Sequence, residues 1–146
     1  MFGKDSVIRD VSNKMDYLVL KFTAGYDYYD ILDEFGSGGD FEGWQVASEA
    51  DLNLLGNSAG IVHGSTDSSI LAKAEQLRDW FGNVGTSSTY IVDRALISDT
   101  IFMSGVGTHQ KAFTIGRRLN VIAYEVGFRV SGWGPISNDE SIFLVR

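Results

Sequence analysis

Hydrophobic and polar residues alternate near the start of the chain, which is the period of a strand with one buried face. The runs Ser6–Arg9 and Asp16–Phe22 follow this pattern and are rich in β-branched, aromatic and aliphatic residues. The mostly polar residues 11–14 between them are typical of a turn. The pattern therefore predicts two strands joined by a turn.

The pattern then changes to that of a helix. Asp27 is a suitable N-cap, and the apolar residues after it have the i, i+3, i+4, i+7 spacing of one helix face; these residues are Tyr28, Ile31, Leu32 and Phe35. Gly36 follows where a glycine in the left-handed conformation often ends a helix. We therefore predict a first helix that ends at Gly36, and a tight loop over residues 36–39.

A short buried strand and a second helix are predicted next. Phe41–Val46 is the expected strand, with Trp44 and Val46 facing the core. Ser48 followed by Asp51 forms an imperfect capping box, which indicates the start of a helix. The apolar residues of this helix are Ala50, Leu52, Leu54 and Leu55, and Gly56–Asn57 is expected to end it.

A third helix is predicted to begin near Thr66 or Asp67 and to close at Gly82. Its apolar side is formed by Ile70, Leu71, Ala74, Leu77, Trp80 and Phe81. Strands follow at Tyr90–Val92, Leu96–Met103, Ala112–Ile115, Val121–Val130 and Ile142–Val145. Helices in the first half and strands in the second predict one globular α+β domain over residues 1–146, with two to three helices and an antiparallel sheet.

Composition and charge narrow the range of functions. The 146 residues carry a net charge of −7 and contain no cysteine, which excludes disulfides, thiolate nucleophiles and zinc–thiolate sites. An acidic chain repels phosphate backbones and anionic membranes, and no apolar run reaches the length of a membrane span. We therefore expect neither nucleic-acid binding nor membrane insertion. The first residues also lack the apolar stretch of a signal peptide.

No arrangement of residues points to catalysis. His63 and His109, the two histidines, are expected in loops, and no serine lies in a Gly-x-Ser-x-Gly elbow. The first helix places its carboxylates, Asp30, Asp33 and Glu34, on its exposed side, while Glu49 and Asp51 complement the dipole of the second helix. Asp40 and Glu42 complete the carboxylates that could pair for glycoside hydrolysis. The prediction is a protein that is not an enzyme.

The best binding candidates lie between Trp133 and the last strand. Trp133 is flanked by two glycines and is the aromatic residue most readily placed at a surface, where it could contact a sugar or a protein. Asn138, Asp139 and Glu140 bring together the oxygen ligands that calcium takes. Calcium is therefore a candidate cofactor, although the EF-hand spacing is absent, and a polar turn without a ligand is the alternative.

Several segments of this sequence resemble a domain of secreted, exosortase-sorted bacterial proteins of the PEP-CTERM type. The similar stretches are Met15–Leu18, Thr23–Ile31, Gly38–Leu52 and the ending Ser141–Arg146. The sequence departs from the family pattern at Tyr17, Gln45 and Ser48, where the family has Trp, Arg and Thr. The family's C-terminal sorting tail does not follow Arg146, and the alternatives are a freely secreted chain, a truncated one or one encoded by a phage.

The segment Gly43–Asp51 is also similar to a motif of the C-type-lectin-like and formylglycine-generating-enzyme folds, where it joins a strand to the second helix. The resemblance implies a C-type-lectin-like fold. The enzymes among these relatives depend on cysteine, which is absent here, so their chemistry is not expected.

The function that these observations favour is a non-catalytic, secreted or surface-exposed module. Its partner would be a protein, a glycan or further copies of itself, assembled on a cell surface or in the extracellular matrix. Two alternatives stay open: a phage virion component, such as a decoration or receptor-binding domain, and a small hydrolase with an unrecognised carboxylate pair.

Overall fold

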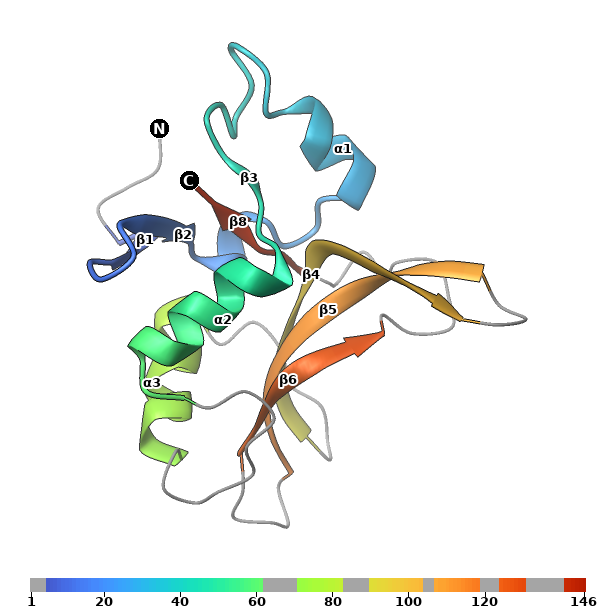
Figure 1. Ribbon diagram of the computed structural model, residues 1–146. Helices are drawn as coiled ribbons and strands as arrows, with labels where there is room; N and C mark the ends of the chain where they lie inside the picture. Colours follow the sequence, from blue (N-terminus) through green and yellow to red (C-terminus); the bar gives the residue numbers. More distant parts are fainter. Residues whose placement is uncertain (1–4, 62–70, 83–89, 104–106, 119–123, 131–140) are drawn as a thin grey trace.

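The computed structural model describes residues 5–61, 71–82, 90–103, 107–118, 124–130 and 141–146. It shows an α+β fold, as the sequence predicts, but its strands form two mainly antiparallel sheets where the sequence predicts one (Figure 1). The helices precede the long strands in the chain, and the short C-terminal strands return to the N-terminal part of the molecule.

Sheet A is small and contains both the first and the last strand. Its order is β1 (Val7–Asp10), β2 (Met15–Leu18), β8 (Leu144–Val145) and β3 (Gln45–Val46), and all its pairs are antiparallel. The β1–β2 turn contains Lys14 at a φ of 58°.

Sheet B is built from much longer strands. Its order is β6 (Tyr124–Val130), β5 (Gly107–Arg118), β4 (Tyr90–Met103) and β7 (Ser141–Ile142). The β4–β5 pairing is antiparallel, with a register shift between Leu96 and Thr100, while β7 pairs with β4 in parallel.

The C-terminal segment connects the two sheets. It forms β7 in sheet B, passes through Phe143 and forms β8 in sheet A, and residues 141–145 are all at most 1% exposed. Thr23 completes the hydrogen bonding of this segment: its hydroxyl accepts the Ile142 N–H at 2.9 Å and lies 2.8 Å from the Ile142 carbonyl oxygen. A buried side chain therefore contacts both backbone polar groups of Ile142.

The helices begin where their capping residues predict. Asp27 accepts a hydrogen bond from the Tyr29 N–H at 2.8 Å at the start of α1 (Tyr28–Asp33). Ser48 and Asp51 form a complete capping box for α2 (Glu49–Ser58). The other helices are the 3-10 helix η1 (Leu20–Phe22) and α3 (Leu71–Phe81), which Gly82 follows at a φ of 98°.

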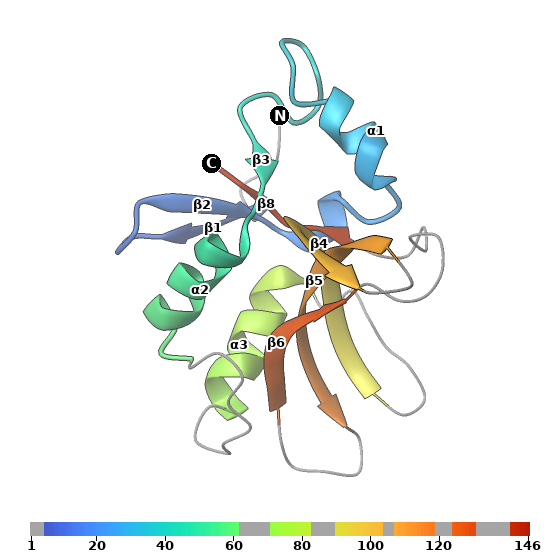
Figure 2. The same cartoon turned by 45° about the vertical axis from the view of Figure 1, so that its right-hand side comes forward.

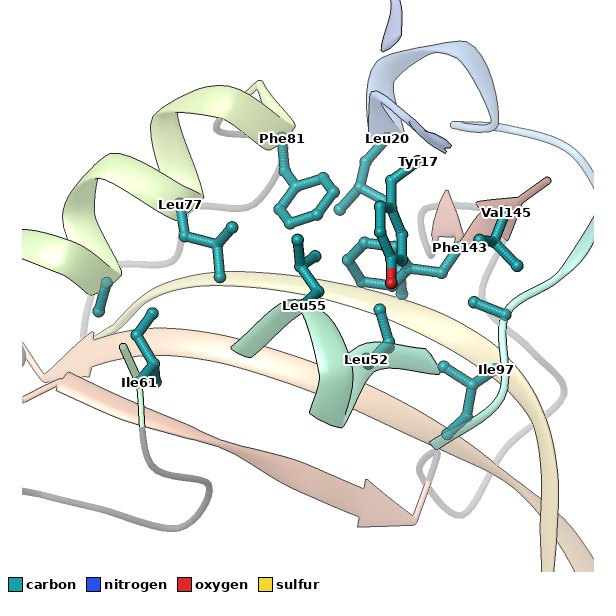
Figure 3. Close-up of a cluster of buried hydrophobic side chains, with 13 residues drawn as sticks. Tyr17, Leu20, Leu52, Leu55, Ile61, Leu77, Phe81, Ile97, Phe143 and Val145 are labelled. Atoms are coloured by element: carbon teal, nitrogen blue, oxygen red, sulfur yellow. The ribbon is translucent and has the colours of Figure 1, made fainter. Parts of the chain in front are cut away.

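The buried side chains form two clusters. The α2–α3 cluster joins both helices to the two sheets and contains Tyr17, Leu20, Ala47, Leu52, Leu55, Ile61, Ala74, Leu77, Phe81, Ala95, Ile97, Phe143 and Val145 (Figure 3). The α1 cluster contains Leu18, Ile31, Phe41, Trp44, Ala112, Ile142 and Leu144. Residues of the C-terminal segment contribute to both clusters, because they alternate between the two sides of the backbone.

Several boundaries differ from the sequence prediction. The second strand ends at Leu18, because residues 20–22 turn into η1. α1 ends at Asp33, and Gly36 has no positive φ, so its predicted role as a left-handed cap is wrong. Only the last two residues of the predicted strand Phe41–Val46 pair with another strand, and Trp44 is buried as predicted. α2 continues through Gly56 to Ser58.

Four further expectations are corrected in the second half. Trp80, predicted on the buried side of α3, is 46% exposed, whereas Arg78 is 9% exposed. The two strands predicted between residues 90 and 103 form one strand, β4, and β5 is longer than Ala112–Ile115. His109, expected in a loop, lies in β5 opposite Ile101. The predicted start of α3 and His63 lie outside the described residues.

Candidate binding surface

The solvent side of α1 exposes large apolar side chains. Tyr29 is 71% exposed and Leu32 is 40% exposed, and their i, i+3 spacing makes them neighbours on the helix surface. Asp30 and Asp33, which lie beside them, are also exposed. The sequence pattern had placed Leu32 on the buried face, so this surface was not predicted.

The other side of α1 is fixed to the core. Ile31 is fully buried in the α1 cluster, and Tyr28 and Phe35 pack against the same cluster. The rings of Tyr28 and Tyr29 are in contact edge to face, with centroids 5.7 Å apart and an interplanar angle of 90°. The capped first turn and this ring contact hold Tyr29 in place although most of its surface is exposed to water.

The carboxylates of Glu34 and Glu42 accept backbone hydrogen bonds within the loop after α1. Glu34 accepts a hydrogen bond from the Asp40 N–H at 3.0 Å, and Glu42 accepts one from the Gly38 N–H at 3.0 Å. Gly39 passes so close to the backbone of Glu34 that a Cβ atom there would overlap the Glu34 carbonyl oxygen. Glu34 and Glu42 therefore act as structural groups, and the loop has a defined path.

Tyr26 connects this loop to the α1 cluster. Its ring meets Phe41 edge to face with centroids 5.2 Å apart, and its hydroxyl donates to Asp40 at 3.4 Å. Burial raises the pKa of Tyr26 above its ordinary value, and the negative charge of Asp40 raises it further. The phenol therefore stays protonated at neutral pH and continues to donate.

The other exposed apolar residues are distributed over separate elements. Val11, in the β1–β2 turn, is 79% exposed, Leu54 on α2 is 41% exposed, and Trp80 on α3 is 46% exposed. α1 lies at the opposite end of the helical part of the molecule from α3 (Figures 1 and 2). Among the described residues, α1 thus combines two exposed apolar side chains within a single helical turn.

A cluster of charged residues at the edge of sheet A has a structural role. Arg9 donates two hydrogen bonds to Asp16, from Nε at 2.6 Å and from Nη2 at 2.8 Å, and Arg146 Nε lies 3.3 Å from the same carboxylate. The Arg146 guanidinium also lies over the Trp44 ring, 4.6 Å from its centroid. These contacts join β1, β2 and the C-terminus, and we assign them to the stability of sheet A.

The carboxylates considered for catalysis are used in other ways. Glu49 forms an ion pair with Lys111 at 2.6 Å, and Asp51 completes the cap of α2. Asp30 and Asp33 are exposed on α1. Within the described ranges, no group of three His, Cys, Asp or Glu side chains is arranged to hold a metal ion.

The predicted binding residues Trp133, Asn138, Asp139 and Glu140 all lie outside the described residues, so the calcium hypothesis stays a prediction. None of the helices in the described part of the chain has the length and hydrophobicity needed to cross a lipid bilayer. Comparison with protein-family models, with curated proteins and with solved structures finds no match to this chain.

Proposed function

We propose that the chain is a non-catalytic binding module whose contact surface is the solvent side of α1. The observation that carries this proposal is the exposure of Tyr29 (71%) and Leu32 (40%) on a helix whose opposite side is fixed in the core. Exposed aromatic side chains that are held rigid lose little entropy on binding, and they are frequent anchors of protein interfaces.

The chemistry around these two residues indicates the partner. Tyr29 and Leu32 offer apolar area, and Asp30 and Asp33 place negative charge beside it. A complementary surface carries an apolar side chain next to Lys or Arg. The partner that fits best is a basic segment of another protein, because an aliphatic side chain such as Leu32 contributes little to a sugar contact.

A display selection tests this proposal. The immobilised protein would be used to select from a random peptide library, and the selected peptides would be measured against a Tyr29→Ser/Leu32→Ser variant. We expect peptides that combine an apolar residue with Lys or Arg, and an affinity for the double variant at least about tenfold lower, since an interface anchor contributes about 2 kcal/mol or more.

Val11→Ser is the matched control, because Val11 is 79% exposed but lies in the β1–β2 turn. It should leave the affinity of the selected peptides unchanged. A library that yields no binder, or binders that lose no affinity for the double variant, would contradict the assignment of the contact surface to α1.

The proposal extends to fold type and location. The segment Gly43–Asp51 passes through β3 into α2. The similar motif of C-type-lectin-like folds also joins a strand to the second helix, and this supports a C-type-lectin-like fold for the chain. The resemblance to exosortase-sorted proteins supports a place outside the cell or at its surface. Fractionation of the producing cells with an antibody to the protein tests the location, and an entirely cytoplasmic signal would contradict it.

A further inference from the structure

β6 forms one edge of sheet B. Within the described part of the chain it pairs with β5 alone, over its whole length of seven residues (Figures 1 and 2). The outer side of such a strand presents backbone N–H and C=O groups to which a further strand can bind. The sequence of β6 indicates which pattern of charged and apolar residues a complementary strand would have.

The register of the sheet assigns the residues of β6 to two faces. Phe128 lies opposite Phe113, which lies opposite Ala95, a member of the α2–α3 cluster. Strand residues alternate between faces, so the positions of Tyr124, Val126, Phe128 and Val130 belong to the face that α3 covers. The positions of Glu125, Gly127 and Arg129 belong to the other face.

The two charged residues of β6 have no charged residue directly opposite them on β5. Glu125 lies opposite Gly116, and Arg129 lies opposite Ala112. Cross-strand neighbours of opposite charge stabilise a sheet, whereas the β5 side offers neither charge at these two positions. A strand added on the outer side of β6 can supply a directly opposite charge at both positions.

β6 is complementary to itself in the antiparallel direction. If Gly127 lies opposite Gly127 of a second copy, Glu125 lies opposite Arg129 and Arg129 opposite Glu125. In the same register the apolar positions also pair, Tyr124 with Val130 and Val126 with Phe128. Both charges and all four apolar residues then have a matching neighbour.

Symmetry excludes most other registers. Two copies related by a two-fold axis perpendicular to the sheet keep the same residues on the same face, so only registers centred on a residue are allowed. Centring on Val126 places Glu125 opposite Gly127, and centring on Phe128 places Arg129 opposite Gly127. The register centred on Gly127 is the one of these three that pairs the charges.

We propose that two copies of the chain associate through β6, antiparallel and centred on Gly127, so that their sheets form one continuous sheet. This inference uses a different surface from α1 and goes beyond the proposed binding function. The dimer would carry two α1 surfaces, which would raise the avidity for a partner with repeated sites.

Charge reversal tests the proposal by sedimentation over a range of protein concentrations. The wild type should form dimers. Glu125→Arg places like charges opposite each other twice, and so does Arg129→Glu, so each variant should raise the dissociation constant of the dimer by roughly tenfold or more. The double variant Glu125→Arg/Arg129→Glu should dimerise again, and an equimolar mixture of the two single variants should form a heterodimer.

The double variant distinguishes loss of the interface from failure to fold. A wild type that stays monomeric at every concentration overturns the proposal, and so does a dimer that survives Glu125→Arg in a folded protein. A single variant that does not fold still leaves the double variant, and a folded but monomeric double variant counts against the register.

A cysteine at the centre of the pair tests the register directly. Gly127→Cys, in a chain without other cysteines, should be joined by a disulfide to its copy upon oxidation, because residues opposite each other across a strand pair are close enough for one.

The two proposals can fail independently. Tyr29→Ser/Leu32→Ser should dimerise as the wild type does, and the monomeric β6 variants should bind the selected peptides with unchanged intrinsic affinity. Loss of the dimer in the α1 variant would assign self-association to α1 and overturn pairing through β6.

Discussion

α1 and the pair α2–α3 differ in what they do with their apolar residues. α2 and α3 direct Leu52, Leu55, Leu77 and Phe81 into the α2–α3 cluster, where each is at most 4% exposed (Figure 3). α1 buries Ile31 completely but leaves two neighbouring apolar side chains, Tyr29 and Leu32, in water, whereas among the described residues α2 and α3 each expose one, Leu54 and Trp80. α2 and α3 thus contribute to the α2–α3 cluster, and α1 is attached through its buried side, while its outer side is the contact surface that we propose.

The charged side chains near α2 and those on α1 also differ in whether they contact other parts of the fold. Lys73 Nζ donates to the Gly60 carbonyl oxygen at 3.1 Å after the end of α2, and Lys111 connects β5 to Glu49 at the start of α2. Both ends of α2 are therefore bound to other elements. On α1 the exposed carboxylates Asp30 and Asp33 lie on the outer side. Charged side chains around α2 thus join parts of the fold, whereas Asp30 and Asp33 on α1 are exposed.

The largest effect should come from Phe143→Ala. Phe143 is 1% exposed and meets Phe81 edge to face, with centroids 4.7 Å apart, and it lies between β7 and β8. Its truncation removes packing from both sheets and should lower the free energy of unfolding by about 3–5 kcal/mol. Urea denaturation measures this, and a loss below about 1 kcal/mol would contradict the central role of the α2–α3 cluster.

Thr23→Val should have the next largest effect. The variant keeps the side-chain shape but leaves the Ile142 N–H and carbonyl without the Thr23 hydroxyl. Unsatisfied buried backbone groups should lower the free energy of unfolding by about 2–3 kcal/mol. Thr23→Ser, which keeps the hydroxyl, should recover most of the loss. Equal losses in both variants would show that packing of the methyl group matters more than the hydrogen bonds.

Acid should weaken sheet A through Asp16. Hydrogen bonds from Arg9 lower the pKa of Asp16, and they outweigh the opposing effect of burial. Since the folded-state pKa is below the unfolded one, this stabilisation is complete above the unfolded pKa and is lost as the pH falls through the folded value. Asp16→Asn should therefore be less stable than the wild type at pH 7, and the gap should shrink on acidification. A gap that is independent of pH would contradict this assignment.

Local features of the fold could be predicted from the sequence, because they depend on nearby residues. The helix caps at Asp27 and Ser48 depend on single polar side chains. The end of α3 at Gly82 depends on a residue without a side chain, which can adopt a positive φ. The rotation of a helix against the core depends on distant residues, so the pattern misplaced Leu32 and Trp80.

Long-range pairing had no signal in the sequence. β7 lies parallel to β4, and β8 lies between β2 and β3, although these strands are far apart in the chain. The exposed apolar pair on α1 was missed for the same reason, since the exposure of Tyr29 follows from how Ile31 docks. The signal that could have found it is in the sequence: Tyr28, Tyr29, Ile31 and Leu32 are apolar within five consecutive residues, and one helix face cannot bury all four.

The smallest effect on stability should come from the outer side of α1, and the same variant tests the central claim most directly. We would measure the free energy of unfolding and the affinity for a selected peptide on one Tyr29→Ser/Leu32→Ser sample. Substitutions of exposed residues usually change stability by no more than about 0.5 kcal/mol, so we predict a small change in stability together with an affinity at least about tenfold lower. A variant that loses several kcal/mol of stability, as core substitutions do, while its affinity is retained would contradict the account, because Tyr29 and Leu32 would then belong to the core.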